Sequence, residues 1–134
     1  MKRALAAFAL LAGGCSEVTL SALTVPPPGK TAHLDDEDDT LDLSRGIAIG
    51  FECTGSDDGY YGPCRDAKVY VDDPEIAAAY TSFMDTLAES YNTGHAGARA
   101  KTAFVIVGLQ PGKTQVTVDT KDGNVTLDVT VTDD

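Results

Sequence analysis

Basic residues are scarce in this sequence. The 134 residues include 10 Lys and Arg against 21 Asp and Glu, which gives a formal net charge of −11. A field of this sign repels nucleic acid and anionic lipid headgroups. We therefore expect no nucleic acid and no nucleotide among the ligands. The length suits one domain.

Long hydrophobic runs are also lacking. The run from Ala4 to Ala12 holds nine apolar residues, which as a helix rise about 14 Å against a hydrocarbon core of roughly 30 Å. This run is therefore not expected to span a membrane. Lys2 and Arg3 precede it and two glycines follow it, an order typical of a signal peptide, here residues 1–14.

The signal peptide leads into a cysteine. Residues 11–15, Leu-Ala-Gly-Gly-Cys, resemble the lipobox of bacterial lipoproteins, with Ala12 where that family most often has Leu. The resemblance implies cleavage before Cys15, lipid on its sulfur and anchoring to a membrane of the bacterial envelope. Ser16, in place of Asp, favours the outer membrane in many bacteria. The alternative is an ordinary secretory signal with cleavage nearby.

Cysteines number only three, an odd count. If Cys15 carries lipid, Cys53 and Cys64 remain to form a disulfide in an oxidising compartment. A metal site is the alternative, but two cysteines eleven apart without a nearby histidine do not match zinc spacing. Removal of Lys2 and Arg3 would leave 8 basic and 21 acidic residues, a net charge of −13.

Recognisable catalytic sets are missing. There is no Gly-x-Ser-x-Gly motif, and His33 and His95 are isolated, as solvated loop histidines are. The pairs Asp57-Asp58 and Asp72-Asp73 have the residue type of a glycosidase site, but adjacent loop carboxylates usually face solvent. We expect no catalytic residues and no cofactor; a small envelope hydrolase is the weakest alternative.

An acidic run offers a possible calcium site. It comprises Asp35, Asp36, Glu37, Asp38, Asp39 and Asp42, on an expected loop. Oxygen ligands suit calcium, and a calcium-stabilised structural or stalk domain is an alternative function. The run lacks the residue order of an EF-hand loop, so a solvated charged loop is the simpler interpretation and no metal ligand is assigned.

The Gly-Lys-Thr at positions 112–114 resembles part of a phosphate-binding loop. The interval from Gly108 to Gly112 is one residue too short for that motif, and Pro111 lacks an amide donor. The residues that follow alternate as a strand does, whereas a phosphate loop leads into a helix. We expect a turn between two strands.

Alternating apolar residues predict most of the fold. Strands are expected over residues 18–25, 47–53 and 67–71, with a bend near Asp66, and as a hairpin around Asp122-Gly123. That hairpin would place Val118 opposite Leu127 and Val116 opposite Val129. The turn-rich stretch 54–63 is expected as a loop. Its Tyr60 and Tyr61 are the binding-loop candidates, with stacking on local structure as the alternative.

Residues 73–91 have a helical spacing. Asp73 would cap the helix and Pro74 would occupy its first position. The apolar stripe consists of Ile76, Tyr80, Phe83, Leu87 and Tyr91.

The strand pattern resembles the group 2 type of bacterial immunoglobulin-like domains. The resemblance covers residues 40–134 except 78–100. It rests on Val69, Val71, Asp73, Pro74, Ile76, Ala77, Phe104, Val105, Val107, Gly108, Pro111, Gly112, Thr114, Val116, Val118, Val129 and Val131. The chain lacks the family's frequent tryptophan.

The group 2 resemblance implies an all-β fold, an immunoglobulin-like β-sandwich of about seven strands. Because the family places Ile76 and Ala77 at a strand end, we expect only a short helical insertion near residues 79–90. Residues 15–39 would form a lipidated segment with a first strand and the acidic loop. The resemblance further implies a non-catalytic binding, adhesion or structural role, with a protein or polysaccharide partner.

Overall fold

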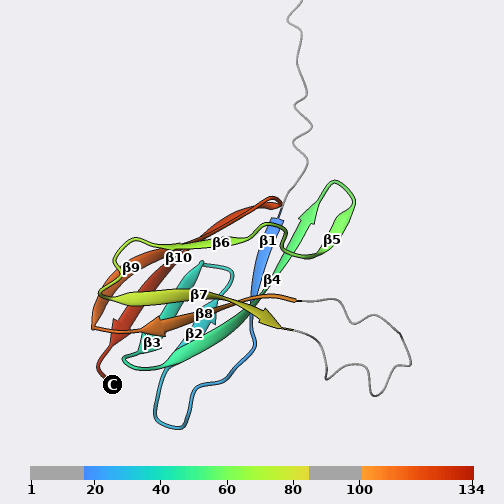
Figure 1. Cartoon of the computed structure of the whole chain (residues 1–134). Coiled ribbons are helices and arrows are strands. Elements are labelled where there is room, and N and C mark those ends of the chain that lie inside the picture. The colour runs from blue at the N-terminus through green and yellow to red at the C-terminus, as the bar shows by residue number, and fades with distance from the viewer. Residues whose placement is uncertain (1–16, 85–100) are drawn as a thin grey trace, which may run out of the picture.

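Two β-sheets packed face to face make up the domain (Figure 1). The computed structural model describes residues 17–84 and 101–134, and within them the chain forms ten strands and no helix. The all-β class is confirmed. The number of strands exceeds the seven expected, because two stretches expected as loops are hairpins and the expected helix begins as a strand.

The strands divide equally between the sheets. The first sheet has the order β1-β4-β8-β7, with β5 also paired to β4, and the second has the order β2-β3-β10-β9-β6. The first contains β1 (Glu17–Ala22), β4 (Ala48–Asp57), β5 (Tyr60–Pro63), β7 (Ala77–Met84) and β8 (Lys101–Gly108). The second contains β2 (Ala32–Asp35), β3 (Thr40–Ser44), β6 (Lys68–Val71), β9 (Gly112–Thr120) and β10 (Gly123–Thr132). All pairs are antiparallel except β3 with β10.

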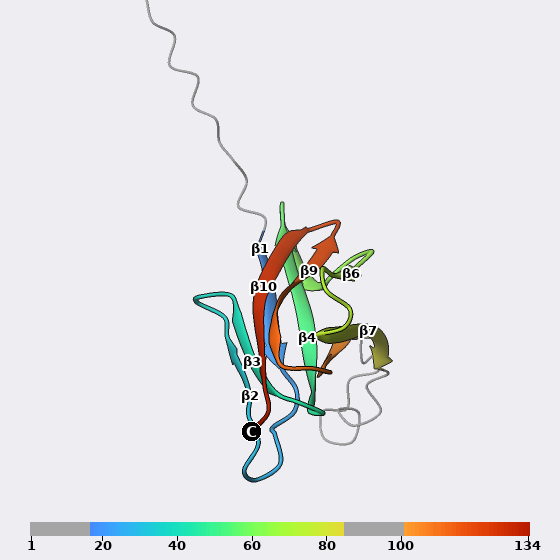
Figure 2. The same ribbon diagram turned by 90° about the vertical axis from the view of Figure 1, so that its left-hand side faces the viewer.

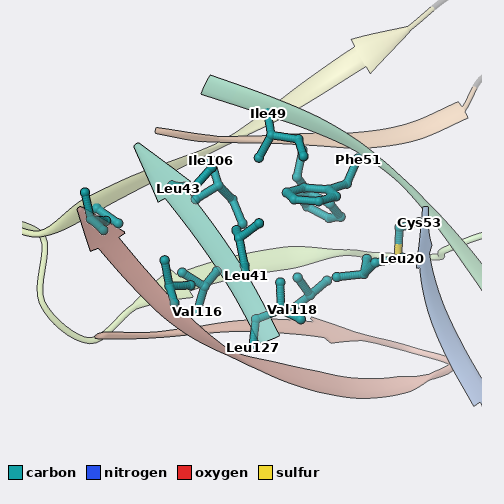
Figure 3. Packing of buried hydrophobic residues seen from close by; sticks show 14 of the residues in the cluster. Leu20, Leu41, Leu43, Ile49, Phe51, Cys53, Ile106, Val116, Val118 and Leu127 are labelled. Carbon is teal, nitrogen blue, oxygen red and sulfur yellow. The ribbon is translucent and has the colours of Figure 1, made fainter. Parts of the chain in front are cut away.

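The core lies between the sheets, because alternate residues of each strand point inward. Figure 3 shows Ile49, Phe51 and Ile106 of the first sheet facing the leucines and valines of the second. The largest fully buried apolar side chains are Phe51, Phe104, Leu41, Leu43, Ile49, Ile106, Leu127, Val116, Val118 and Val129. Alternation predicts the inward set Ile47, Ile49, Phe51 and Cys53; the last three are buried on β4, whereas Ile47 precedes the strand and is half-buried.

The short helix expected near residues 79–90 does not form in its described part, because residues 79–84 belong to β7. The Asp73 carboxylate does accept a hydrogen bond from the Glu75 amide at 3.0 Å, as a cap would. Only one turn follows, and β7 begins at Ala77 because the free edge of β8 supplies its partner over eight residue pairs. Tyr80, expected in the apolar stripe, is 60% exposed. Leu87 and Tyr91 lie outside the described residues.

The final hairpin forms, but its register differs by two residues from the one expected. Thr120 pairs with Gly123, so the turn residues are Lys121 and Asp122, and Val118 lies opposite Val125 rather than Leu127. A shift of two preserves the face of every side chain. Val116, Val118, Leu127 and Val129 are therefore buried as expected, although not in the expected pairs.

The two extra hairpins lie in the acidic run and in the stretch 54–63. Residues 36–39 connect β2 to β3, and Asp58 and Gly59 connect β4 to β5. β8 pairs with β4 only as far as Cys53, and β5 then takes the same side of β4 from Thr54 to Asp57. The first sheet thereby extends beyond the end of β8.

The strand assignment of β7 predicts costs of different size for two substitutions. Tyr80→Ala should lower the free energy of unfolding by about 1 kcal/mol or less, because the ring faces solvent at a sheet edge. Ile106→Ala, in the neighbouring strand, should cost about 2–5 kcal/mol by leaving a cavity in the core. Urea denaturation measures both. A cost for Tyr80→Ala as large as that for Ile106→Ala would indicate a helix that buries Tyr80.

Candidate binding surface at the stapled end

One end of the sandwich gathers the sequence-predicted site residues that the structure describes. We call it the stapled end: the start of β1, residues 53–67 and the β9–β10 turn. Figure 2 shows these segments together at the end opposite the carboxyl terminus. The Cα of Glu17 pairs with Ser56, and the Asp122 side chain lies against Gly55.

The Cys53–Cys64 disulfide closes the hairpin that β4 and β5 form. The sulfur atoms are bonded to each other, and the two residues are 0% and 4% exposed. The Cys64 amide donates to the Cys53 carbonyl at 3.1 Å, and the Thr102 hydroxyl donates to the Cys64 carbonyl at 2.8 Å. The pair predicted from the cysteine count is therefore a buried structural bridge, without a free thiol in the described chain.

A two-residue turn forms the tip of this hairpin. Asp58 and Gly59 both have positive φ, +43° and +87°. Asp-Gly with that geometry makes the tight turn whose twist matches antiparallel strands. The turn sets Asp57 opposite Tyr60 and Ser56 opposite Tyr61.

The two tyrosines of the hairpin have different environments. The Tyr60 hydroxyl donates to the Pro63 carbonyl at 2.5 Å, and its ring lies 4.1 Å below the Arg65 guanidinium. Tyr61 is 76% exposed. Tyr60 thus stacks on local structure, the alternative left open by the sequence, whereas Tyr61 is available for contact.

An ion pair between a buried carboxylate and a partly exposed arginine joins the hairpin to the second sheet. The Asp122 side chain is 0% exposed, and Arg65 holds both of its oxygens. The Arg65 Nε donates to Oδ1 at 2.7 Å and the Arg65 amide donates to Oδ2 at 3.0 Å, while Nη2 also contacts Oδ1. The Lys121 amide donates back to the Arg65 carbonyl at 2.9 Å. The bend at Arg65 and the β9–β10 turn are therefore fixed to each other.

This pairing shifts the acidity of the carboxyl group. Hydrogen bonds from the Arg65 side chain lower the pKa of Asp122, and the Arg65 amide and the guanidinium charge act in the same direction, against burial. The Asp122 carboxylate in turn raises the pKa of Arg65. Arg65 also lies 3.7 Å from Asp57, at the end of β4.

Gly55 makes room for the carboxylate. It continues the inward row of β4, and a Cβ there would lie 2.7 Å from Asp122 Oδ2 and 2.8 Å from its Cβ. Atoms do not approach so closely, so any side chain at position 55 would displace Asp122. Sequence reasoning missed this Gly55–Arg65–Asp122 contact. Its one available signal was the expected bend near Asp66, whose φ is +51°.

The remaining candidates lie elsewhere. His33 is exposed on β2, a strand where a loop was expected, and Lys113 and Thr114 lie on β9 beyond the expected turn. Asp35 Oδ1 accepts from the amides of Glu37 and Asp38. Across residues 17–84 and 101–134, no group of three or more His, Cys, Asp or Glu side chains is arranged to hold a metal ion. Cys15 and His95 lie outside these ranges.

An open hollow of about 770 Å³ lies on the outer face of the second sheet. Its lining is polar and includes Asp42, Asp72, Asp73, Lys113 and Asp128. Gln115 Nε2 donates to Asp128 at 2.8 Å, and Asp73 accepts from the Glu75 amide. Both hydrogen bonds are internal to the protein, and the hollow is an open depression of the outer face.

Comparisons with known proteins identify the fold only. No family model and no curated protein matches the chain. Among solved structures, S-layer protein rSbsC(31-844) superposes with a TM-score of 0.53 and 16% identity over 90% of this chain and 13% of that one. Domains 4 and 5 of S-layer protein SbsC superpose with a TM-score of 0.51 and 17% identity over 88% of this chain and 53% of theirs.

This chain therefore shares a β-sandwich fold with single domains of much longer S-layer proteins. In the described part of the chain, no helix has the length and apolarity needed to cross a membrane.

The packing of Asp122 on Gly55 predicts different outcomes for two glycines of β4. Gly55→Ala should lower the free energy of unfolding by about 1–3 kcal/mol, because the methyl group overpacks the buried carboxylate. Gly50→Ala is the matched control, since a Cβ there meets nothing closer than 3.8 Å. It should change stability by about 0.5 kcal/mol or less. Chemical denaturation measures the change in the free energy of unfolding for each variant, and equal changes at both positions would contradict this packing.

The lowered pKa of Asp122 predicts a specific dependence of stability on pH. Below the ordinary carboxyl pKa of about 3.9, the unfolded chain takes up a proton at Asp122 before the folded one does. Acidification therefore removes stability that the ion pair supplies at neutral pH. Asp122→Asn should be less stable than wild type at pH 7, and the difference should narrow as the pH falls through 4. Urea titrations between pH 3 and 7 measure this, and a constant difference would refute it.

Proposed function

We propose that the protein is a non-catalytic domain of the bacterial cell envelope, held to a membrane by lipid on Cys15. The fold carries the proposal. The two-sheet sandwich over residues 17–84 and 101–134 resembles domains of S-layer, or surface layer, proteins. The lipobox-like residues 11–15 add the anchor, and Ser16 favours the outer membrane.

The chemistry of the stapled end supports a structural or binding role. Its sulfur atoms form the disulfide, and its buried carboxylate, Asp122, is paired with Arg65. Arg65, Asp122 and Tyr60 thus have a structural role: their contacts hold the hairpin and the two sheets together. Rigid sandwiches commonly carry binding on the loops at their ends. We propose that the domain presents such loops to a protein or polysaccharide of the envelope, as the group 2 resemblance implies.

The anchor is tested by metabolic labelling with a radioactive fatty acid. Wild type should take up label, and Cys15→Ala should lose it, because the thioether forms on that sulfur alone. The double variant Cys53→Ala/Cys64→Ala is the matched control: it removes the other two cysteines and should keep the label. Equal label in wild type and Cys15→Ala would exclude the lipid anchor.

A further inference from the structure

Tyr61 lies close to the start of the described chain. Ser56 of β4 pairs with Glu17 of β1 on one side and with Tyr61 of β5 on the other. The three residues thus form one row across the sheet, and directly paired residues project from the same face. With strands spaced about 4.8 Å apart, the Cα atoms of Glu17 and Tyr61 are roughly 10 Å apart.

The proposed lipid site is only two residues before Glu17. Two residues reach at most about 7 Å. The β4–β5 hairpin extends beyond the Glu17 row by a similar amount, through the Asp57–Tyr60 pair and the turn at Asp58 and Gly59. The turn residues Asp58 and Gly59 can therefore reach as far beyond the Glu17 row as Cys15 does, and Tyr61 lies in that row behind them.

The hairpin is also rigid enough to hold a fixed position. The disulfide closes its base, and the Arg65–Asp122 pair ties the adjoining bend to the second sheet. Tyr61 projects from this support with 76% of its surface exposed. A tyrosine with an apolar ring and a polar hydroxyl is suited to the boundary between headgroups and acyl chains.

The net charge of the stapled end determines which lipid headgroups it can approach. Glu17, Asp57, Asp58 and Asp66 at this end are offset only in part by Lys121, because the charge of Arg65 is paired with Asp122. Anionic headgroups are therefore disfavoured and zwitterionic ones are tolerated.

We propose that the stapled end of the sandwich lies against the bilayer and that Tyr61 inserts its ring among zwitterionic headgroups. This inference rests on the proposed lipidation of Cys15. It makes Tyr61 a membrane contact, in place of a contact for a protein or polysaccharide. The domain then stands end-on at the membrane, without a stalk between lipid and fold.

The absence of tryptophan from the chain allows a direct test. Tyr61→Trp and Val25→Trp each introduce a single tryptophan at a position that is 76% or 89% exposed, respectively. Val25 follows β1 by three residues and lies toward the opposite end of the sandwich, roughly 25 Å from Glu17 along the extended chain. Each full-length variant is produced with its own signal, purified from membranes and reconstituted in phosphatidylcholine vesicles.

Two measurements on the same vesicles separate the possible outcomes. Flotation reports anchoring, and quenching by brominated phosphatidylcholine, relative to unbrominated vesicles, reports contact with lipid. Tyr61→Trp should float, shift its emission to the blue and be quenched, while Val25→Trp floats without quenching. Floating protein with Tyr61→Trp quenched no more than Val25→Trp would overturn the membrane contact and leave the anchor intact. Protein that does not float would overturn both.

Discussion

The buried carboxylate of Asp122 constrains the whole stapled end. A charge without solvent is costly unless it is paired and hydrogen-bonded, and Arg65 meets both requirements from its side chain and its amide. Arg65 directly follows Cys64, so the disulfide and the ion pair act on adjacent residues. The disulfide secures the hairpin within the first sheet, and the ion pair secures it to the second. Neither contact alone fixes the hairpin to both sheets.

The same constraint explains the register of the last hairpin. The sequence favoured a turn at Asp122-Gly123, and the alternation of valines and leucines could not correct it, because Val118 finds an apolar partner in Val125 or in Leu127. Alternation determines the face of each residue, and the face was predicted correctly. The register depends on where Asp122 must point, which is set by Arg65, 57 residues away in the chain. No local pattern contains that information.

The two Asp-Gly dipeptides show what a local sequence signal can predict and what it cannot. At Asp58-Gly59 it forms the tight turn whose twist suits a hairpin, within a stretch that was expected only as a loop. At Asp122-Gly123 the same dipeptide does not occupy the two turn positions, because the aspartate is drawn inward. Solvent surrounds the first aspartate and the core surrounds the second. The dipeptide predicts a change of direction, and the tertiary contacts decide which residues make it.

Strand β7 is another case in which tertiary contacts override local sequence signals. Ile76 and Tyr80 have helical spacing and Asp73 caps a turn, so the local signals agree on a helix. They are overridden because β8 otherwise has an open edge of hydrogen-bonding groups over eight residues. The cysteine count, by contrast, predicts the disulfide correctly, because within the described residues Cys53 and Cys64 have no other cysteine to pair with.

Anchoring through Cys15 would give the two ends of the sandwich different contacts. The stapled end would be occupied by the membrane, because two residues are too few to hold it away. The opposite end would carry the contacts with other envelope components. There the connections after β1 and after β8 present Val25 and Leu109, which are 89% and 39% exposed. The fold would then act as a spacer whose length, set by the ten residues of β4, separates the lipid surface from the partner by roughly 33 Å.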